Sequence, residues 1–141
     1  MAEIHPQLQQ DCLTIGRFKM CYLLLMRDAN YPWFVLVPDR EGITEIYQLS
    51  KEDQHQLIEE SSYLASILMK TFQADKMNIA AIGNIVSQLH IHHVVRYRDD
   101  AAWPAPVWGK VPVEPYTEAQ MAIVITKLKE VLTDSFEFFG K

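Results

Sequence analysis

The sequence predicts a single α+β domain, in which an antiparallel β-sheet is covered by one helix and followed by a C-terminal helix. Short apolar runs separated by turn residues occupy the first part of the chain, and a long helical pattern follows them. A second pair of strand-like runs then precedes a last helical pattern. At 141 residues the chain is long enough for one domain with its own core, so we expect residues 1–141 to form one domain.

Four strands are predicted, at residues 14–26, 33–37, 77–82 and 89–95. The almost continuous apolar run at 20–26 is too short for most helices and is typical of a strand buried on both faces. Turn residues at 27–32 make the first two strands an antiparallel hairpin, and Gly83-Asn84 separates the last two. The first ten residues are a polar lead-in or a helical turn.

Two helices are predicted from their caps and apolar spacing. Ser50 is an N-cap with Asp53 in the first turn, and Thr117 forms a capping box with Gln120. The apolar stripe of the first helix is Leu57, Leu64, Leu68 and Phe72. That of the second runs from Met121 to Phe136, with Gly140 available as a C-terminal cap.

Composition excludes several classes of partner. The net charge of −5 and the pI near 5.5 argue against a general nucleic-acid binder, although a single nucleotide needs only a local pocket. Cys12 and Cys21 are interpreted as reduced thiols. The N-terminus has no signal-peptide pattern, and the longest apolar run is far too short for a membrane helix. We therefore expect a cytoplasmic protein without nucleic-acid or membrane partners.

The most informative segment is the predicted strand around Gln88, His90 and His92. Side chains alternate along a strand, so these three project to one face, each about 6.6 Å from the next, while His93 points away. Polar groups are costly to bury without partners. That face is therefore either a pocket or a surface that meets other polar groups.

Three interpretations of this row compete. His-x-His on a strand can chelate zinc, but no further cysteine or histidine cluster is available, so we predict no metal site. The histidines could instead be structural and hydrogen-bonded. The third interpretation is a nucleophilic histidine, because neutral imidazole is a good nucleophile near pH 7.

A long connection without regular structure joins the last strand to the last helix. Residues 96–116 hold four of the seven prolines and two of the three tryptophans. Such loops are uncommon and are either functional or disordered, and the aromatic residues argue against disorder. The loop could also simply pack across the edge of the sheet.

The stretch from Asn78 to Arg96 resembles the signature of the histidine triad (HIT) superfamily, His-φ-His-φ-His-φ-φ with φ apolar. Asn78, Gly83 and His90-Ile91-His92 lie at close to the family spacing. The resemblance extends to Asp28 and the run at 35–38, and covers about residues 14–108, which we take as the HIT-like core. The C-terminal loop and helix at 109–141 indicate an elaborated bacterial-type subgroup.

One departure concerns the first histidine of the motif, which is Gln88 here. Trp33 stands where many relatives carry a further upstream histidine. By position, His90 matches the family nucleophile and His92 the last triad histidine. Glutamine can hydrogen-bond a phosphate oxygen but cannot shuttle a proton.

The resemblance implies a nucleotide hydrolase or nucleotidyl transferase acting on a nucleoside phosphoramidate or a dinucleoside polyphosphate through a nucleotidyl-histidine. It implies catalytic roles for Gln88, His90 and His92, no cofactor, and a homodimer. The resemblance implies that Asp28 binds the ribose. The other predicted nucleotide-binding residues are Asn78, Gly83, Asn84 and Ser87, and Trp103 in the Pro-rich loop is a candidate lid or specificity residue. The alternatives are a non-catalytic nucleotide-binding or interaction module and a metal-dependent hydrolase that also uses His93.

Overall fold

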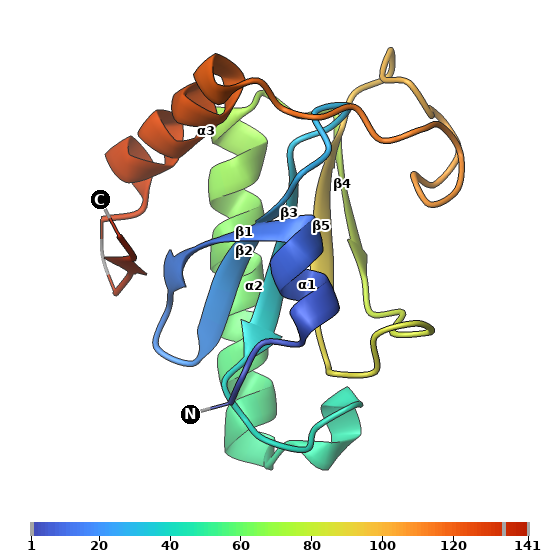
Figure 1. The fold of residues 1–141 in the computed structure, drawn as a ribbon. Coiled ribbons are helices and arrows are strands. Elements are labelled where there is room, and N and C mark those ends of the chain that lie inside the picture. Colours follow the sequence, from blue (N-terminus) through green and yellow to red (C-terminus); the bar gives the residue numbers. More distant parts are fainter. Residues whose placement is uncertain (1, 134, 141) are drawn as a thin grey trace.

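The computed structural model describes residues 2–133 and 135–140. A six-stranded sheet in the order β4-β5-β3-β2-β1-β6 organises the fold, and every pairing is antiparallel (Figure 1). The strands are β1 (Cys12–Arg17), β2 (Cys21–Met26), β3 (Trp33–Pro38), β4 (Lys76–Ala80), β5 (Ile91–Arg96) and β6 (Glu137–Phe138). The helices are α1 (Pro6–Asp11), α2 (Lys51–Thr71) and α3 (Glu118–Val131), with a 3-10 turn at Ile46–Gln48. The predicted α+β class is confirmed.

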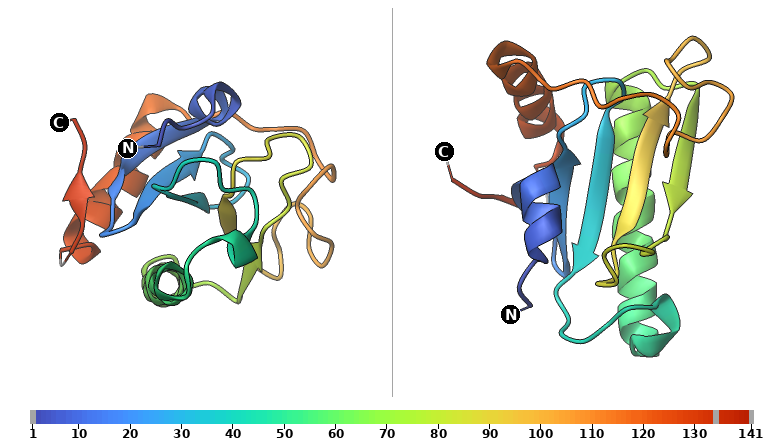
Figure 2. Two further views of the ribbon diagram at one scale, coloured as in Figure 1. Left: turned by 90° about the horizontal axis from the view of Figure 1, so that it is seen from below. Right: turned by 45° about the vertical axis from the view of Figure 1, so that its right-hand side comes forward.

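Each face of the sheet carries its own apolar core. Leu23, Leu25 and Phe34 point to one face and pack with α2 and α3, while Leu24 and Val35 point to the other. Figure 2 shows α2 running along one face, with α1 on the opposite side beside β1. The alternation expected of strands buried on both faces is therefore observed.

The prediction of one strand over 14–26 is wrong, because this segment is a hairpin of β1 and β2. The N–H of Phe18 donates to the carbonyl of Cys21 at 2.8 Å and closes the turn. Phe18 and Met20 are buried in the core on the α2 side, and residues 18–21 include none of the Gly, Pro, Asn, Asp or Ser residues that usually mark a turn.

The prediction of a helix extending to Phe136 is also wrong. The Thr117 capping box forms as expected, but α3 ends at Val131 and the chain returns to the sheet. Phe136 packs on Phe18, with ring centroids 4.7 Å apart, and β6 then pairs with β1. Burial of the aromatic side chain and strand pairing at this sheet edge therefore prevail over the helical spacing of apolar residues. Gly140 follows β6 and so does not cap a helix, contrary to the prediction.

Candidate functional site

His90 and His92 come together on the face of the sheet opposite α2. His90 immediately precedes β5 and His92 lies within it, and their ring centroids are 4.9 Å apart. Both side chains are largely buried, His90 with 6% and His92 with 5% exposure. The strand alternation predicted this pairing, and it also predicted that His93 would face the other way.

The tautomer of His90 is fixed by the backbone. Its Nδ1 lies 2.6 Å from the carbonyl oxygen of Gln88. A carbonyl oxygen only accepts, so Nδ1 carries the proton and donates it. Nε2 is left with a free lone pair, which is the form of imidazole that attacks an electrophile.

His92 is held in the opposite tautomer. The indole N–H of Trp33 donates to Nδ1 of His92 at 3.0 Å, so the proton of neutral His92 sits on Nε2. Burial, with smaller contributions from the charges of His90 and His93, lowers the pKa of His92 to about 4. In their neutral forms the two imidazoles therefore present one nitrogen lone pair, on His90, and one N–H donor, on His92.

His93 is a structural residue on the α2 side. Its Nδ1–H donates to the carbonyl of Ile91 at 3.1 Å, and its Nε2 lies 2.7 Å from the hydroxyl of Ser61 on α2. Burial lowers the pKa of His93 to about 4. Both ring nitrogens are occupied, so this histidine is not available for chemistry.

Acidification should destabilise the fold through these buried imidazoles. Between pH 6.5 and about 4, His92 and His93 are protonated in the unfolded chain but remain neutral in the folded protein. The free energy of unfolding therefore falls as the pH falls through this window. At pH 5 each of the two histidines should lower the free energy of unfolding by about 2 kcal/mol relative to neutral pH. Urea titrations at pH 7.5 and 5 measure this loss. His93→Asn should show a shallower pH dependence, and an unchanged slope would contradict the assignment.

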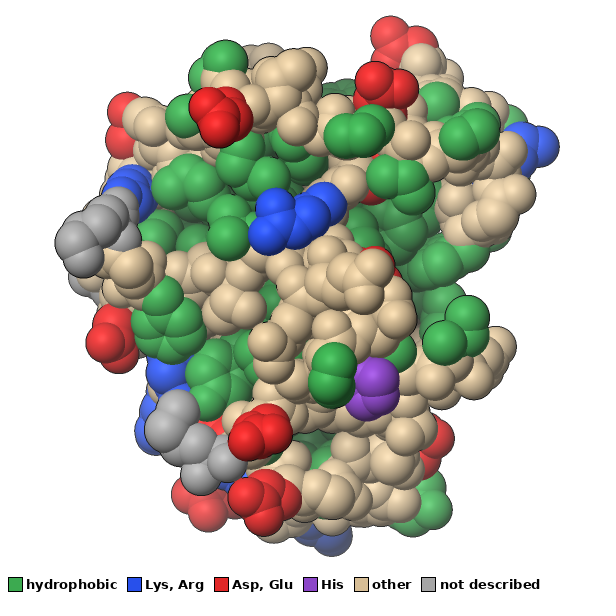
Figure 3. All heavy atoms as spheres, viewed as in Figure 1, with side chains coloured by type: hydrophobic (Ala, Val, Ile, Leu, Met, Phe, Trp, Pro, Cys, Tyr) green, Lys and Arg blue, Asp and Glu red, His purple; other side chains and the backbone are tan. Residues whose placement is uncertain are grey.

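A cavity of about 560 Å³ opens in front of the two histidines. Its walls come from α1, from the end of β2, from the loop after β4 and from the segment after β5. Figure 3 shows the corresponding hollow at the right-hand edge of the molecule, with hydrophobic side chains at its surface. The lining residues are Gln7, Leu8, Asp11, Met26, Ile82, Gly83, Asn84, Ile85, Val86, His90, His92 and Trp108. A concave apolar site with a few convergent polar groups is typical of small-molecule binding.

Two of the predicted nucleotide-binding residues, Gly83 and Asn84, line this cavity. Gly83 has φ +72°, a conformation that favours glycine and turns the loop at this point. Ser87 and Gln88 line a smaller recess beside it, which Gly83 and His90 share.

The side chain of Gln88 faces the N-terminal segment rather than continuing the row of histidines. Its Nε2 donates to the carbonyl of Glu3 at 2.9 Å, and its Oε1 accepts from the N–H of His5 at 2.8 Å. Gln88 precedes β5, so strand alternation does not govern its direction. The amide thus ties the segment before α1 to the loop that carries His90.

Asp28, Asn78 and Trp103 lie away from the lining of the cavity. Asp28 is buried, and its Oδ1 accepts from the N–H groups of Asn30 at 3.0 Å and Glu114 at 3.2 Å. Asn78 and Trp103 both contact Arg96 instead. The structure therefore does not place these three predicted residues beside the histidines.

Arg96 organises the long loop after β5. Its side chain is only 2% exposed and forms a two-pronged ion pair with Asp100, at 2.8 and 3.1 Å. It also donates to the side-chain oxygen of Asn78 at 2.7 Å and to the carbonyl of Ala105 at 2.8 Å. Its guanidinium lies against the rings of Tyr31 and Trp103. These contacts order the loop whose far end carries Trp108.

Trp108 and the residues of α1 are site components that sequence reasoning missed. The ring of Trp108 lies 5.1 Å from that of His92 and 5.5 Å from that of Trp33, measured between centroids. The loop between 103 and 109 is visible in the sequence as aromatic and Pro-rich, but nothing local distinguishes its two tryptophans. Pro6 at the start of α1 was the available signal for a helix there.

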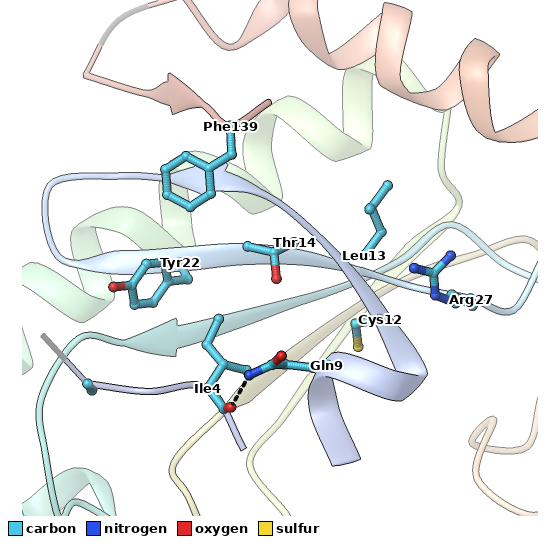
Figure 4. Close-up of a pocket in the computed structure, with 9 residues that line it drawn as sticks. Ile4, Gln9, Cys12, Leu13, Thr14, Tyr22, Arg27 and Phe139 are labelled. Atoms are coloured by element: carbon cyan, nitrogen blue, oxygen red, sulfur yellow. Dashed lines mark hydrogen bonds between the residues drawn. The ribbon is translucent and has the colours of Figure 1, made fainter. Parts of the chain in front are cut away.

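A second cavity, of about 420 Å³, lies beside β1 and β2 (Figure 4). It contains none of the predicted site residues among its lining. Burial raises the pKa of the Cys12 thiol in its wall to about 12, so this cysteine stays protonated and unreactive.

Two further features bear on the predicted partners. Among residues 2–133 and 135–140, no group of three or more His, Cys, Asp or Glu side chains is placed to hold a metal ion. Within the same described residues, no helix combines the length and apolarity needed to cross a bilayer.

The chain is similar to one protein family and to several solved structures. The HIT domain family matches residues 7–99. A histidine triad protein from Marinobacter aquaeolei VT8 is 51% identical, with a TM-score of 0.91 over 94% of this chain and 96% of that one. Histidine triad proteins from Bradyrhizobium japonicum and Sinorhizobium meliloti 1021 are 39% and 38% identical, with TM-scores of 0.89 and 0.88. These two matches cover 91% of this chain and 96% and 95% of those proteins, respectively.

A more distant structure extends the likeness at the level of fold alone. It is a hypothetical histidine triad nucleotide-binding protein from Sulfolobus tokodaii, 15% identical with a TM-score of 0.56 over 82% of each chain. No curated protein matches the chain. The histidine pair on the sheet, the family match over residues 7–99 and the relatives of nearly equal length lead to one conclusion: this chain belongs to the histidine triad family.

Proposed function

We propose that the chain binds a nucleotide in the cavity beside His90 and transfers its nucleotidyl group through a covalent nucleotidyl-histidine. The observation that carries the proposal is the tautomer of His90, whose Nδ1–H is held by the carbonyl of Gln88 at 2.6 Å. This contact leaves Nε2 with its lone pair at the end of an apolar cavity. A neutral nucleophile suits an anionic phosphate, which would repel a carboxylate.

In the first step, Nε2 of His90 forms a bond to the α-phosphorus, and the bond from phosphorus to the leaving group breaks. In the second, water attacks the same phosphorus and releases a proton to the solvent, the P–N bond breaks, and its electron pair returns to Nε2. The Nε2–H of His92 and backbone N–H groups of the loop at 83–87 would stabilise the phosphate oxygens. The nucleoside would lie against the apolar wall formed by residues such as Leu8, Ile85 and Val86.

The other predicted residues fit supporting roles in this scheme. Gln88 supplies the carbonyl that orients His90, while its amide anchors the segment before α1. Asn78 and Trp103 support Arg96, and Asp28 connects the turn after β2 to the chain near Glu114. We propose that these residues shape the site rather than touch the phosphate.

The test is mass spectrometry of the protein mixed with a dinucleoside polyphosphate or an adenosine phosphoramidate. The expected result is a mass increase of one nucleotidyl group, located on His90, together with release of the nucleoside monophosphate. Tight nucleotide binding without adduct or hydrolysis across the panel would overturn the catalytic proposal and favour a non-catalytic nucleotide-binding module.

We also propose that the protein forms a homodimer by joining two sheets at β4. This strand lies at the sheet edge, and among the described residues no strand pairs with its outer side. Ile79 within it is 50% exposed. An exposed edge strand with apolar side chains favours pairing with a second chain.

Light scattering coupled to size-exclusion chromatography measures this assembly. We expect a mass twice that of the 16.3 kDa chain. Ile79→Lys should shift the protein toward the monomer, whereas Ile123→Lys, at an equally exposed site on α3, should not. A monomeric parent protein at micromolar concentration would exclude the dimer.

A further inference from the structure

We infer that Trp33 holds His92 as a hydrogen-bond donor that cannot supply a proton, so that the site favours substrates whose leaving group departs as a weakly basic anion. Phosphoric anhydrides and acyl phosphates belong to this class, and phosphoramidates of amines do not. The inference rests on the proposed nucleotidyl transfer and narrows its substrate class.

The tautomer of His92 is fixed by a hydrogen bond between the neighbouring strands β3 and β5. Trp33 begins β3 and is 7% exposed, and its indole N–H donates to Nδ1 of His92 at 3.0 Å. Indole nitrogen is a donor only. To become an imidazolium, His92 would need a second proton on Nδ1. That proton would point at the indole N–H of Trp33, so the hydrogen bond between the two residues would be lost.

The aromatic surroundings of His92 reinforce this state. Its ring makes T-shaped contacts with Trp33, with centroids 5.8 Å apart, and with Trp108 at 5.1 Å. Neither ring supplies an anion that would stabilise an imidazolium, and His90 is a second basic group beside it. Burial, with the charges of His90 and His93, holds the pKa of His92 near 4.

The other titratable groups that line the cavity do not replace this acid. Of the described residues that line the cavity, the ionisable ones are His90, His92 and Asp11. The proton of His90 points to the carbonyl of Gln88, and Nε2 is the attacking atom. Asp11 is on the α1 wall, where the amide of Gln7 donates to its carboxylate at 3.1 Å. His93 is directed to Ser61 on the opposite face of the sheet.

Leaving-group chemistry then decides the substrate. In an anhydride the P–O bond breaks with its electron pair on oxygen, and the departing phosphate or carboxylate is stable without a proton. In a phosphoramidate the P–N bond breaks toward a strongly basic nitrogen, which leaves only if it is protonated in the transition state. General acid catalysis is typically worth about 10²–10⁴-fold. The site should therefore favour the anhydride by about 100-fold or more in kcat/KM.

The experiment compares diadenosine polyphosphate with adenosine phosphoramidate, which share the same nucleoside, on the intact protein. Trp33→Phe keeps the aromatic ring and removes the donor, so His92 can accept a proton at Nδ1. Near pH 6 we expect this variant to reduce the ratio of kcat/KM for the anhydride to kcat/KM for the phosphoramidate about 10-fold. The change should come chiefly from a higher kcat on the phosphoramidate. Tyr63→Phe changes an exposed aromatic ring on α2, on the opposite face of the sheet, and should leave the ratio of the two rates unchanged.

Nitrogen-15 NMR of the imidazoles provides a readout on the parent protein that needs no variant to fold. We expect the proton of the neutral imidazole to be on Nε2 in His92 and on Nδ1 in His90, with His92 shifting toward an ordinary titration in Trp33→Phe. Comparable kcat/KM for both substrates, or His92 protonated at Nδ1, would overturn the inference and leave the proposed function standing. Absence of any adduct or turnover with either substrate would instead overturn the proposed function and, with it, this inference.

Discussion

His90→Ala is expected to abolish the nucleotidyl adduct and to lower kcat/KM by about 10⁴-fold or more, because no other group can take its place as nucleophile. In the described part of the chain, the remaining imidazole at the cavity, His92, carries its proton on Nε2 and has its Nδ1 occupied by Trp33. His93 lies on the opposite face of the sheet. Single-turnover assays with mass spectrometry of the quenched protein measure both effects.

The matched control is His55→Ala, the same substitution at an exposed histidine on α2. This variant should retain parental kinetics and the same adduct mass. Nucleotide affinity of His90→Ala should change much less than its turnover, because the apolar wall of the cavity remains. An adduct that persists in His90→Ala would place the nucleophile elsewhere and refute the proposed mechanism.

Arg96→Ala is expected to reduce the free energy of unfolding by about 3–5 kcal/mol, which is the usual cost of removing one partner from a buried ion pair. The substitution removes the cationic partner of the buried Asp100 carboxylate. It also removes the hydrogen-bond donor to the side-chain oxygen of Asn78 and to the carbonyl of Ala105. Hydrogen bonds from Arg96 and the backbone hold the pKa of Asp100 below its ordinary value against the opposing effect of burial. Without Arg96, that pKa should rise.

Arg98→Ala is the control two residues away. Arg98 is 76% exposed and its nitrogen lies 3.9 Å from Asp75, so its loss should change stability by no more than about 0.5 kcal/mol. Urea unfolding of both variants gives the comparison. Arg96→Ala should also weaken nucleotide binding, because the loop it orders carries Trp108 to the cavity. Equal stability of the two variants would show that the buried network does not support the loop.

Much of the framework follows from local signals in the sequence. The N-caps at Ser50 and Thr117 form the hydrogen bonds their residue types predict, since a cap depends only on residues within one turn. The alternation along β5 correctly separates His92 from His93, because strand geometry leaves no other choice. These predictions hold because each depends on residues close together in the chain.

Three features depended on contacts between distant segments. The sequence does not reveal the turn at Phe18, because its apolar residues are buried in the core that α2 and α3 cover. Phe136 packs in the same cluster and does not extend α3. The amide of Gln88 is directed by the backbone of Glu3 and His5, more than eighty residues earlier in the chain. No local pattern encodes such partners.

The amino-acid sequence alone determined the α+β class, the two capped helices and a histidine pair on one face of the sheet, because each follows from the short-range geometry of the backbone. Only the tertiary structure decided which tryptophan reaches that pair and which tautomer each imidazole adopts. These outcomes depend on hydrogen bonds and ring contacts that exist only once β3, β5 and the loop after β5 have packed together.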